Sequence, residues 1–253
     1  MLSPLITGLI VFAAVLAGAF AGWIASKFLP AQHLEQDARS HVSVSMAVVA
    51  TLTALVVGLL ISNANTAFNA RSNEVVSLSA DILRLDQLLR HYGPETEPAR
   101  RALQRYAEGK LADLFPEEER DVHIDNRSTY EQLFEVERQL LTLKPADAFH
   151  RWDVGQAMTR ATDIGNTRWL LAQQERQGTP KAFVALVVFW LTLLFASFGL
   201  FTPRNFTAVL VLTLSALAVS GAVWMILELE KPFGGMLRMS PAAMHNAVQA
   251  LSQ

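Results

Sequence analysis

The sequence predicts an all-α integral membrane protein with four transmembrane helices and a cytoplasmic helical bundle inserted between the second and the third. Four long stretches contain no charged residue, and charges gather between the second and third stretches. This distribution is typical of a membrane protein that carries a polar domain. The predicted domains are residues 1–65 with two spans, 66–180 with the helical domain, 181–230 with two spans, and 231–253 with a turn and an amphipathic helix.

Each uncharged stretch is long enough to cross a bilayer, which takes about 20 mostly apolar residues in a helix. The unbroken apolar runs exclude the alternating pattern of a barrel strand. The first stretch has an alternative interpretation as a signal peptide, but no Lys or Arg precedes it and its apolar core is longer than a signal core. The predicted spans are Leu5 to Ser26, Val44 to Asn65, Ala182 to Phe201 and Phe206 to Leu227.

Lys and Arg near the span ends predict the orientation, because cytoplasmic loops carry an excess of both. One side, which holds the middle segment and the C-terminus, has Arg71, Arg84, Arg176, Lys181, Lys231 and Arg238. The other side has Lys27, Arg39 and Arg204. We therefore expect both termini and the middle domain in the cytoplasm, with the spans in a bacterial inner membrane.

The middle domain is predicted to be a bundle of four helices with a core of its own. Its first helix continues the second span without Pro or Gly as far as His91, and Gly93-Pro94 ends it. Ser128 and Glu131 predict a capping box at the start of the third helix. We expect Ile82 and Trp152 to be buried. Ser240-Pro241 predicts a short amphipathic helix in the tail, which either lies on the membrane surface or docks on the middle domain.

The second span has a face of small and polar residues. They are spaced by three and four, so they lie along one side of a helix: Ser43, Ala47, Thr51, Ala54, Gly58, Ser62, Asn65 and Asn69. One interpretation is the wall of a water-filled pathway, because polar groups are costly in lipid unless they meet water or a partner. The other is close helix packing, which small residues permit. Ala14, Gly18 and Gly22 in the first span predict packing alone.

Little in the sequence indicates catalysis or cofactor binding. The chain has no cysteine, and it has no phosphate-binding loop, nucleophile elbow or zinc-protease motif. Asp121, His123 and Asp125 alternate in one acidic loop, where a solvated loop is a better interpretation than a metal site. With a net charge of −2, nucleic acid is not an expected partner. We expect no enzyme and no cofactor.

The segment after the fourth span resembles the closing motif of the bacterial bestrophin-like domain family. It reads Glu228-Leu-Glu-Lys-Pro-Phe-Gly-Gly, and the residues that carry the likeness are Glu228, Lys231, Pro232, Phe233 and Gly235. Asn65-Thr-Ala-Phe68, followed by Glu74, is similar to a segment of bacterial bestrophins. The layout of two spans, a helical insert and two spans matches over nearly the whole chain.

The resemblance implies an oligomeric channel for small ions, pentameric and most often anion-selective, whose second helix lines the pore. It places Ala54, Gly58, Ser62 and Asn65 on the pore wall, and we assign Thr51 and Asn69 to the same wall because they share that helix face. Bestrophins have bulky apolar side chains at their narrow neck, where this chain has Ala, Gly and Ser. The alternative is therefore a non-conducting membrane scaffold or sensor whose cytoplasmic helices bind a partner.

Overall fold

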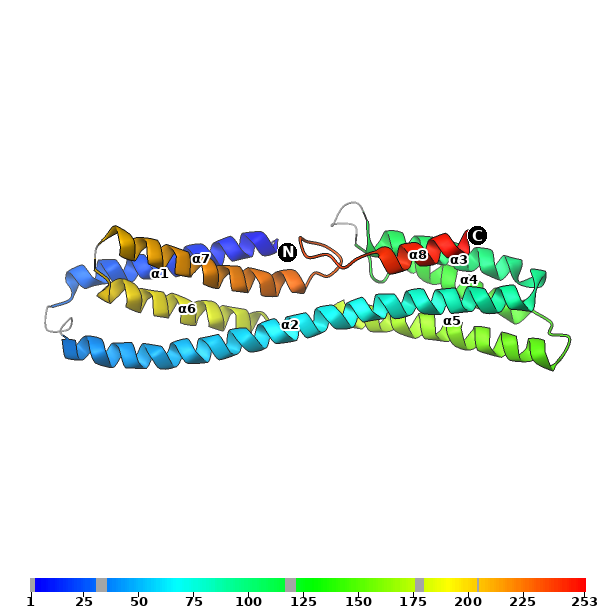
Figure 1. Cartoon of the computed structure of the whole chain (residues 1–253), viewed down its shortest axis with the longest axis horizontal. Coiled ribbons are helices and arrows are strands. Elements are labelled where there is room, and N and C mark those ends of the chain that lie inside the picture. Colours follow the sequence, from blue (N-terminus) through cyan, green and yellow to red (C-terminus); the bar gives the residue numbers. More distant parts are fainter. Residues whose placement is uncertain (1–2, 31–35, 117–121, 176–179, 204) are drawn as a thin grey trace. The chain divides into compact units, whose positions relative to one another are not determined.

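The described residues of this computed structural model, which are 3–30, 36–116, 122–175, 180–203 and 205–253, form helices and connecting turns without a strand. The chain divides into unit 1, Met1–Ala67 with Thr179–Glu230, and unit 2, Phe68–Gly178 with Lys231–Gln253. The helices, labelled in Figure 1, are α1 (Pro4–Phe28), α2 (Gln36–Tyr92), α3 (Glu97–Leu114), α4 (Arg127–Thr142), α5 (Ala148–Glu175), α6 (Lys181–Phe201), α7 (Phe206–Leu229) and α8 (Ala242–Leu251). A short 3₁₀ turn, η2 (Pro94–Thr96), precedes α3.

Among the described residues, four helices are long and apolar enough to cross a membrane, and their apolar parts lie in unit 1. The spans are Pro4–Phe28, the N-terminal part of Arg39–Tyr92, Ala182–Phe201 and Phe206–Leu229, so each predicted stretch lies within one continuous helix. Two caps fit their sequences: the side chain of Ser3 accepts a hydrogen bond from the Ile6 amide, and that of Asn205 accepts one from the Ala208 amide. Of the Lys and Arg used for orientation, Arg176 and Arg204 lie outside the described residues.

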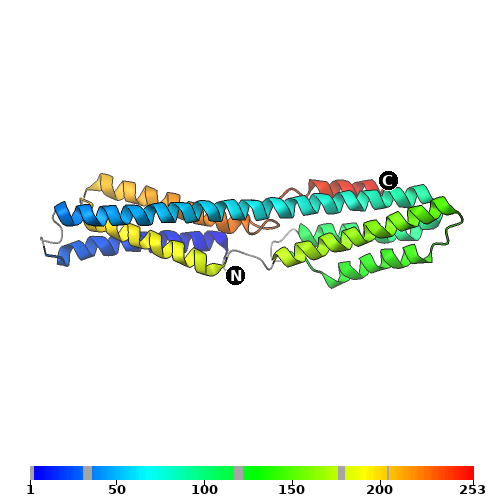
Figure 2. The same cartoon turned by 90° about the horizontal axis from the view of Figure 1, so that it is seen from below.

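Glycines bring α1 and α6 into direct backbone contact, as Figure 2 shows for the neighbouring ribbons. A Cβ atom on Gly22 would lie 1.9 Å from the Ala196 carbonyl oxygen, and one on Gly199 would lie 1.9 Å from that of Ala19. Gly18 likewise faces the backbone of Thr192. The prediction that the small face of the first span packs against a helix is therefore confirmed, and the partner is within the chain.

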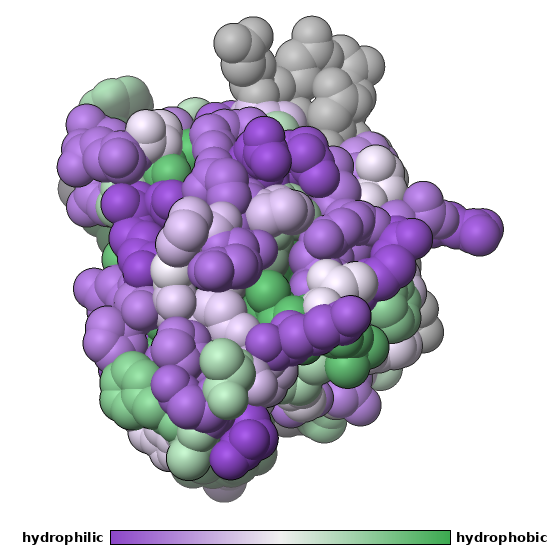
Figure 3. Space-filling model, turned by 90° about the vertical axis from the view of Figure 1, so that its right-hand side faces the viewer, coloured by the Kyte–Doolittle hydropathy of each residue, from purple (hydrophilic) through white to green (hydrophobic). Residues whose placement is uncertain are grey.

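Unit 2 is a helical bundle around an apolar core. The C-terminal part of α2 has a buried apolar seam that includes Ile82, as predicted, and consists of Val75, Leu78, Ile82, Leu85 and Leu89. Side chains of α3, α4 and α5 complete the core, among them Leu103, Tyr106, Val136, Leu140, Ala161 and Ile164. Seen from the end where α2 terminates, the surface of this unit is mostly hydrophilic (Figure 3).

The tail helix α8 docks on the bundle, which decides between the two positions left open by the sequence. Met244, Ala247 and Leu251 are part of the unit 2 core. The Ser79 hydroxyl lies 3.5 Å from the Met244 sulfur, and Arg90 donates a hydrogen bond to the Ala250 carbonyl over 3.1 Å.

Two local predictions are wrong. Trp152 is 57% exposed rather than buried, because the inward face of α5 presents Asp153 and Ala157 at this level. The N-cap of α4 is Asn126 rather than Ser128, since the Asn126 side chain accepts a hydrogen bond from the Ser128 amide over 3.0 Å. Asparagine is as good an N-cap as serine, so the helix simply begins two residues earlier.

Candidate pore-lining face and closing motif

The six residues predicted to line a pore share one face of α2. At about 100° per residue they fall within about 40° of Gly58 on either side. All six are exposed in the single chain, and they are Thr51, Ala54, Gly58, Ser62, Asn65 and Asn69. A Cβ atom on Gly58 would meet nothing within 4 Å. No other helix of the described chain therefore covers this face.

The second span is also the least buried of the four. Only 11% of its most apolar window is buried, against 33%, 28% and 22% for the first, third and fourth spans. It touches the rest of its unit along a strip that includes Thr53, Leu60 and Ala64, on the side opposite Gly58. This span therefore keeps most of its surface available for contacts outside its own chain.

The hydrogen-bonding groups on this face differ in whether they have a partner within the chain. The Thr51 hydroxyl is satisfied within α2, because it donates to the Ala47 carbonyl over 2.9 Å. Among the described residues, the side-chain amides of Asn65 and Asn69 have no hydrogen-bond partner. Burying such a group in lipid without a partner costs several kcal/mol. The end of the face toward Asn69 therefore needs hydrogen-bond partners from water or from a second chain.

A second open face lies about a quarter turn around the same helix. It is aliphatic, and its exposed side chains are Val48, Leu52, Leu55 and Leu59. Aliphatic side chains suit lipid or an apolar protein contact, and amides do not. The two faces of α2 thus demand different surroundings, which a single helix placed in lipid cannot supply.

The closing motif is built as a tight turn after α7. Glu228 is buried at the end of that helix, and Phe233 is buried in unit 2 with its ring centroid 5.9 Å from that of Phe115. The Met239 amide donates to the Pro232 carbonyl over 2.9 Å. Gly235 has a φ of 83°, a left-handed conformation that disfavours other residues. The motif therefore anchors the tail that carries α8.

The described residues contain no cluster of three or more His, Asp or Glu able to hold a metal ion. The acidic loop considered for a metal is only partly within the described residues, because Asp121 lies outside them. Asp125 instead pairs with Arg168 over 2.5 Å. This contact reaches 43 positions along the chain, so local spacing did not reveal it.

Unit 2 also holds buried polar groups that the sequence did not predict as such. Lys110 is fully enclosed on α3, and burial lowers its pKa to about 8 while Asp113 opposes the change. Burial likewise raises the pKa of the nearby Tyr106 hydroxyl. The Asp113 carboxylate accepts hydrogen bonds from the Thr129 hydroxyl and the Asn126 amide. These contacts tie the start of α4 to α3.

Comparison with known proteins agrees with this architecture. The Bestrophin-like domain family matches residues 12–244. A variant of a bacterial bestrophin homolog from Klebsiella pneumoniae is similar in structure, with a TM-score of 0.69 and 16% identity over 96% of this chain and 99% of that chain. A second solved structure, described as a membrane protein, has a TM-score of 0.67 and 16% identity over 95% of this chain and 96% of that chain.

No curated protein sequence matches the chain. The identities to the solved structures are low, so these structures establish the fold and not the activity. The family match covers most of the chain, and the apolar helices place the protein in a membrane. The chain therefore belongs to the bestrophin-like domain family.

Proposed function

We propose that this protein is the subunit of a homo-oligomeric ion channel, and that the Thr51 to Asn69 face of α2 lines its axial pathway. The observation that carries the proposal is the exposure of this small, polar face on the least buried span. Around a closed symmetric axis, one face of each α2 meets water and the adjoining aliphatic face meets lipid or a neighbouring subunit. Such an arrangement satisfies both faces at once.

The finer parts of the proposal follow from the resemblance and the charges. Five subunits and anion conduction are expected from the likeness to bestrophins. From Thr51 to Asn69 the face has no charged side chain, while the Asn65 and Asn69 amides supply N–H donors suited to anions. The Lys and Arg excess supports a cytoplasmic location in a bacterial cell for unit 2 and both termini, and the mostly hydrophilic surface in Figure 3 is consistent with an aqueous location for unit 2.

One observation favours a second function. The open space above Gly58 and the small side chain of Ala54 would also admit a helix from another subunit at close range. In that case α2 helices pack together, no axial path exists, and the protein is a scaffold whose unit 2 binds a partner.

Accessibility distinguishes the two functions, and the absence of native cysteine makes the experiment direct. A thiol reacts with a charged reagent only where water reaches it and lets it ionise. Single Cys variants on the polar face are compared with matched variants on the aliphatic face. The first set replaces Thr51, Ala54, Gly58, Ser62 and Asn65, and the second replaces Leu52, Leu55 and Leu59.

For a channel, we expect a small charged thiol reagent to label the first set and spare the second. The same labelling should block the current of the purified protein in planar bilayers. The amount of current blocked should be larger in chloride than in gluconate. Protection of both sets, together with no current from the unlabelled protein, would reject the channel and support the scaffold.

A further inference from the structure

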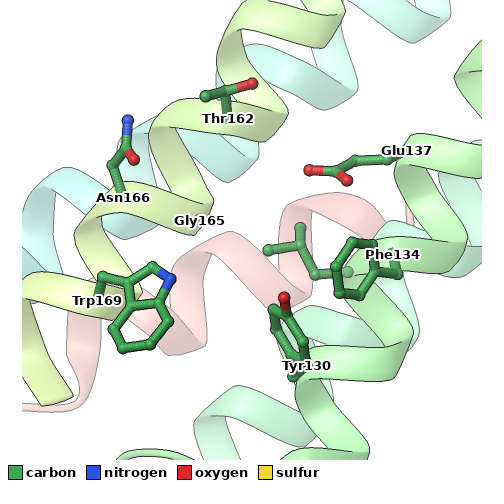
Figure 4. A pocket seen from close by; sticks show the side chains of 8 residues that line it. Tyr130, Phe134, Glu137, Thr162, Gly165, Asn166 and Trp169 are labelled. Carbon is green, nitrogen blue, oxygen red and sulfur yellow. The ribbon is translucent and has the colours of Figure 1, made fainter.

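A groove on the surface of unit 2 is lined by three aromatic side chains. It lies between α4 and α5 and has a volume of about 170 Å³. Tyr130 and Phe134 contribute from α4 with their ring centroids 4.4 Å apart and an interplanar angle of 74°, and Trp169 faces them from α5 (Figure 4). Phe134 is 47% exposed and Trp169 is 61% exposed. Exposed apolar side chains that gather in a groove mark a ligand or partner site more often than side chains that are scattered singly.

The groove is also lined by a carboxylate, that of Glu137. Glu137 extends from α4 into the space toward α5 in Figure 4. The other carboxylates of α4 have cationic partners, since Glu131 pairs with Arg127 and Glu135 with Arg138. Among the described residues, Glu137 has no ion-pair partner. The groove therefore combines electron-rich ring faces with a carboxylate that pairs with no cation in the described part of the chain.

One cation already lies against these rings. The guanidinium carbon of Arg168 is 4.1 Å from the Tyr130 ring centroid and 5.4 Å from that of Trp169. Its charge is balanced by Asp125 at 2.5 Å, so it does not neutralise Glu137. Both distances fall within the range of attractive cation–π contacts, and Arg168 is not among the residues that line the groove.

We propose that this groove binds a small quaternary ammonium head group of the choline type. The methyl groups would pack on Tyr130, Phe134 and Trp169, and Glu137 would supply the counter-charge. The volume is below that of drug-sized ligand pockets, so it fits a head group and not a larger molecule. Gly165 forms part of the wall, where an added Cβ would meet only Leu133 at 3.8 Å, so the space is open to a ligand. The proposal does not depend on ion conduction.

Calorimetric titration of the full-length protein with choline tests the proposal. The protein is held in phosphatidylglycerol nanodiscs, which offer no choline head group. The matched neutral ligand is 3,3-dimethyl-1-butanol, which has nearly the same shape and no charge. Saturable binding of choline and at least tenfold weaker binding of the alcohol are expected. Equal binding of the two would overturn the proposal, because the groove would then recognise shape alone.

Paired variants assign the binding to this groove. Trp169→Leu and Glu137→Gln should each weaken choline binding about fivefold. Trp169→Phe keeps an aromatic face and should change choline binding less than twofold. This variant distinguishes a loss of binding due to the missing ring from a loss due to misfolding. The controls are Trp152→Leu, an exposed tryptophan on the same helix, and Glu135→Gln, a paired carboxylate on α4. Equal loss in the variants and their controls would overturn the assignment.

Two further outcomes are informative. Absence of choline binding to the wild-type assembly would overturn the proposal, since it means that a neighbouring subunit covers the groove or that the rings do not bind the cation. Repeating the titration in phosphatidylcholine nanodiscs separates the sources of the ligand. Binding that disappears there identifies lipid head groups as occupants, and binding that persists identifies the free cation; both support the proposed chemistry.

Discussion

The side-chain nitrogen of Lys110 donates a hydrogen bond to the main-chain carbonyl of Ile124 over 2.5 Å, inside a helical bundle that encloses the lysine completely. The contact joins α3 to the segment that leads into α4. A buried ammonium group is costly, and here the carbonyl and the nearby Asp113 offset only part of that cost.

This contact predicts an unusual dependence of stability on pH. Burial lowers the pKa of Lys110 from 10.5 to about 8. Between these values the unfolded chain retains the proton that the folded chain has released, so the free energy of unfolding rises with pH in that window. The full rise is on the order of 3 kcal/mol. Urea unfolding of the solubilised protein should show this rise in wild type relative to Lys110→Met.

Lys144→Met provides the control, because Lys144 is an exposed lysine of the same unit. Its stability should follow that of wild type across the window. Parallel curves for wild type and Lys110→Met would contradict the interpretation.

The buried carboxylate of Asp113 predicts a second effect. Thr129→Val removes the hydroxyl that donates to Asp113 and leaves a buried oxygen without that partner. We expect a loss of about 1–3 kcal/mol in the free energy of unfolding. Thr142→Val should cost less than about 0.5 kcal/mol, because that exposed hydroxyl bonds only within its own helix. Similar losses in both variants would show that Asp113 is not the cause.

Burial predicts opposite outcomes for two large side chains of unit 2. Leu103→Ala should destabilise the protein by about 2–5 kcal/mol, since Leu103 is enclosed on α3. Trp152→Ala should cost about 1 kcal/mol or less in the isolated subunit, because the indole is mostly exposed. Thermal or urea unfolding of the two variants checks this difference, and a Trp152→Ala cost equal to that of Leu103→Ala would refute it.

Substitutions at two glycines of the spans should affect different properties, namely folding in one case and conduction in the other. Gly22→Leu should prevent normal packing of α1 on α6 and reduce the yield of folded protein, because even a Cβ atom clashes with the Ala196 backbone. At Gly58 an added Cβ atom would have no described neighbour within 4 Å, so the Gly58→Leu subunit should fold. If α2 lines a pore, this variant should assemble normally and conduct less in planar bilayers. Folded Gly58→Leu subunits that fail to assemble would instead indicate tight helix packing at this position.

Much of the fold follows from local patterns in the sequence. Uncharged stretches fix the spans, and the alternating three-and-four spacing from Val75 to Leu89 fixes the buried seam of α2. The absence of Pro and Gly from Thr66 to His91 predicts that the helix continues beyond the second span, and α2 is continuous from Gln36 to Tyr92. These features depend on neighbours within a few residues, which is why they can be read from one chain.

Features that depend on distant contacts were not predictable in this way. Trp152 has the spacing of a core residue, but the side of α5 that faces inward is set by how α5 packs on α2 and α4. In the sequence, nothing distinguishes Lys110 from a surface lysine. Its environment follows only from the fold, which brings the Ile124 carbonyl beside it. The groove with Glu137 and Trp169 needs two helices that are separate in the sequence. The pore-lining face remains a prediction, because this face is open in the single chain and its surroundings lie outside that chain.

The docking of α8 on unit 2 has a consequence for how the protein is made. The bundle core includes Ser79 and Met244, whose contact joins positions separated by 165 residues, with two membrane spans synthesised between them. During synthesis, α2 to α5 leave the ribosome long before α8. Until α8 docks, their core has an open apolar gap at the place that Met244, Ala247 and Leu251 later fill. The bundle can therefore close only after the last two spans have been synthesised. A nascent chain stalled before α8 would expose that gap to chaperones and proteases, which couples survival of unit 2 to synthesis of the spans that precede α8.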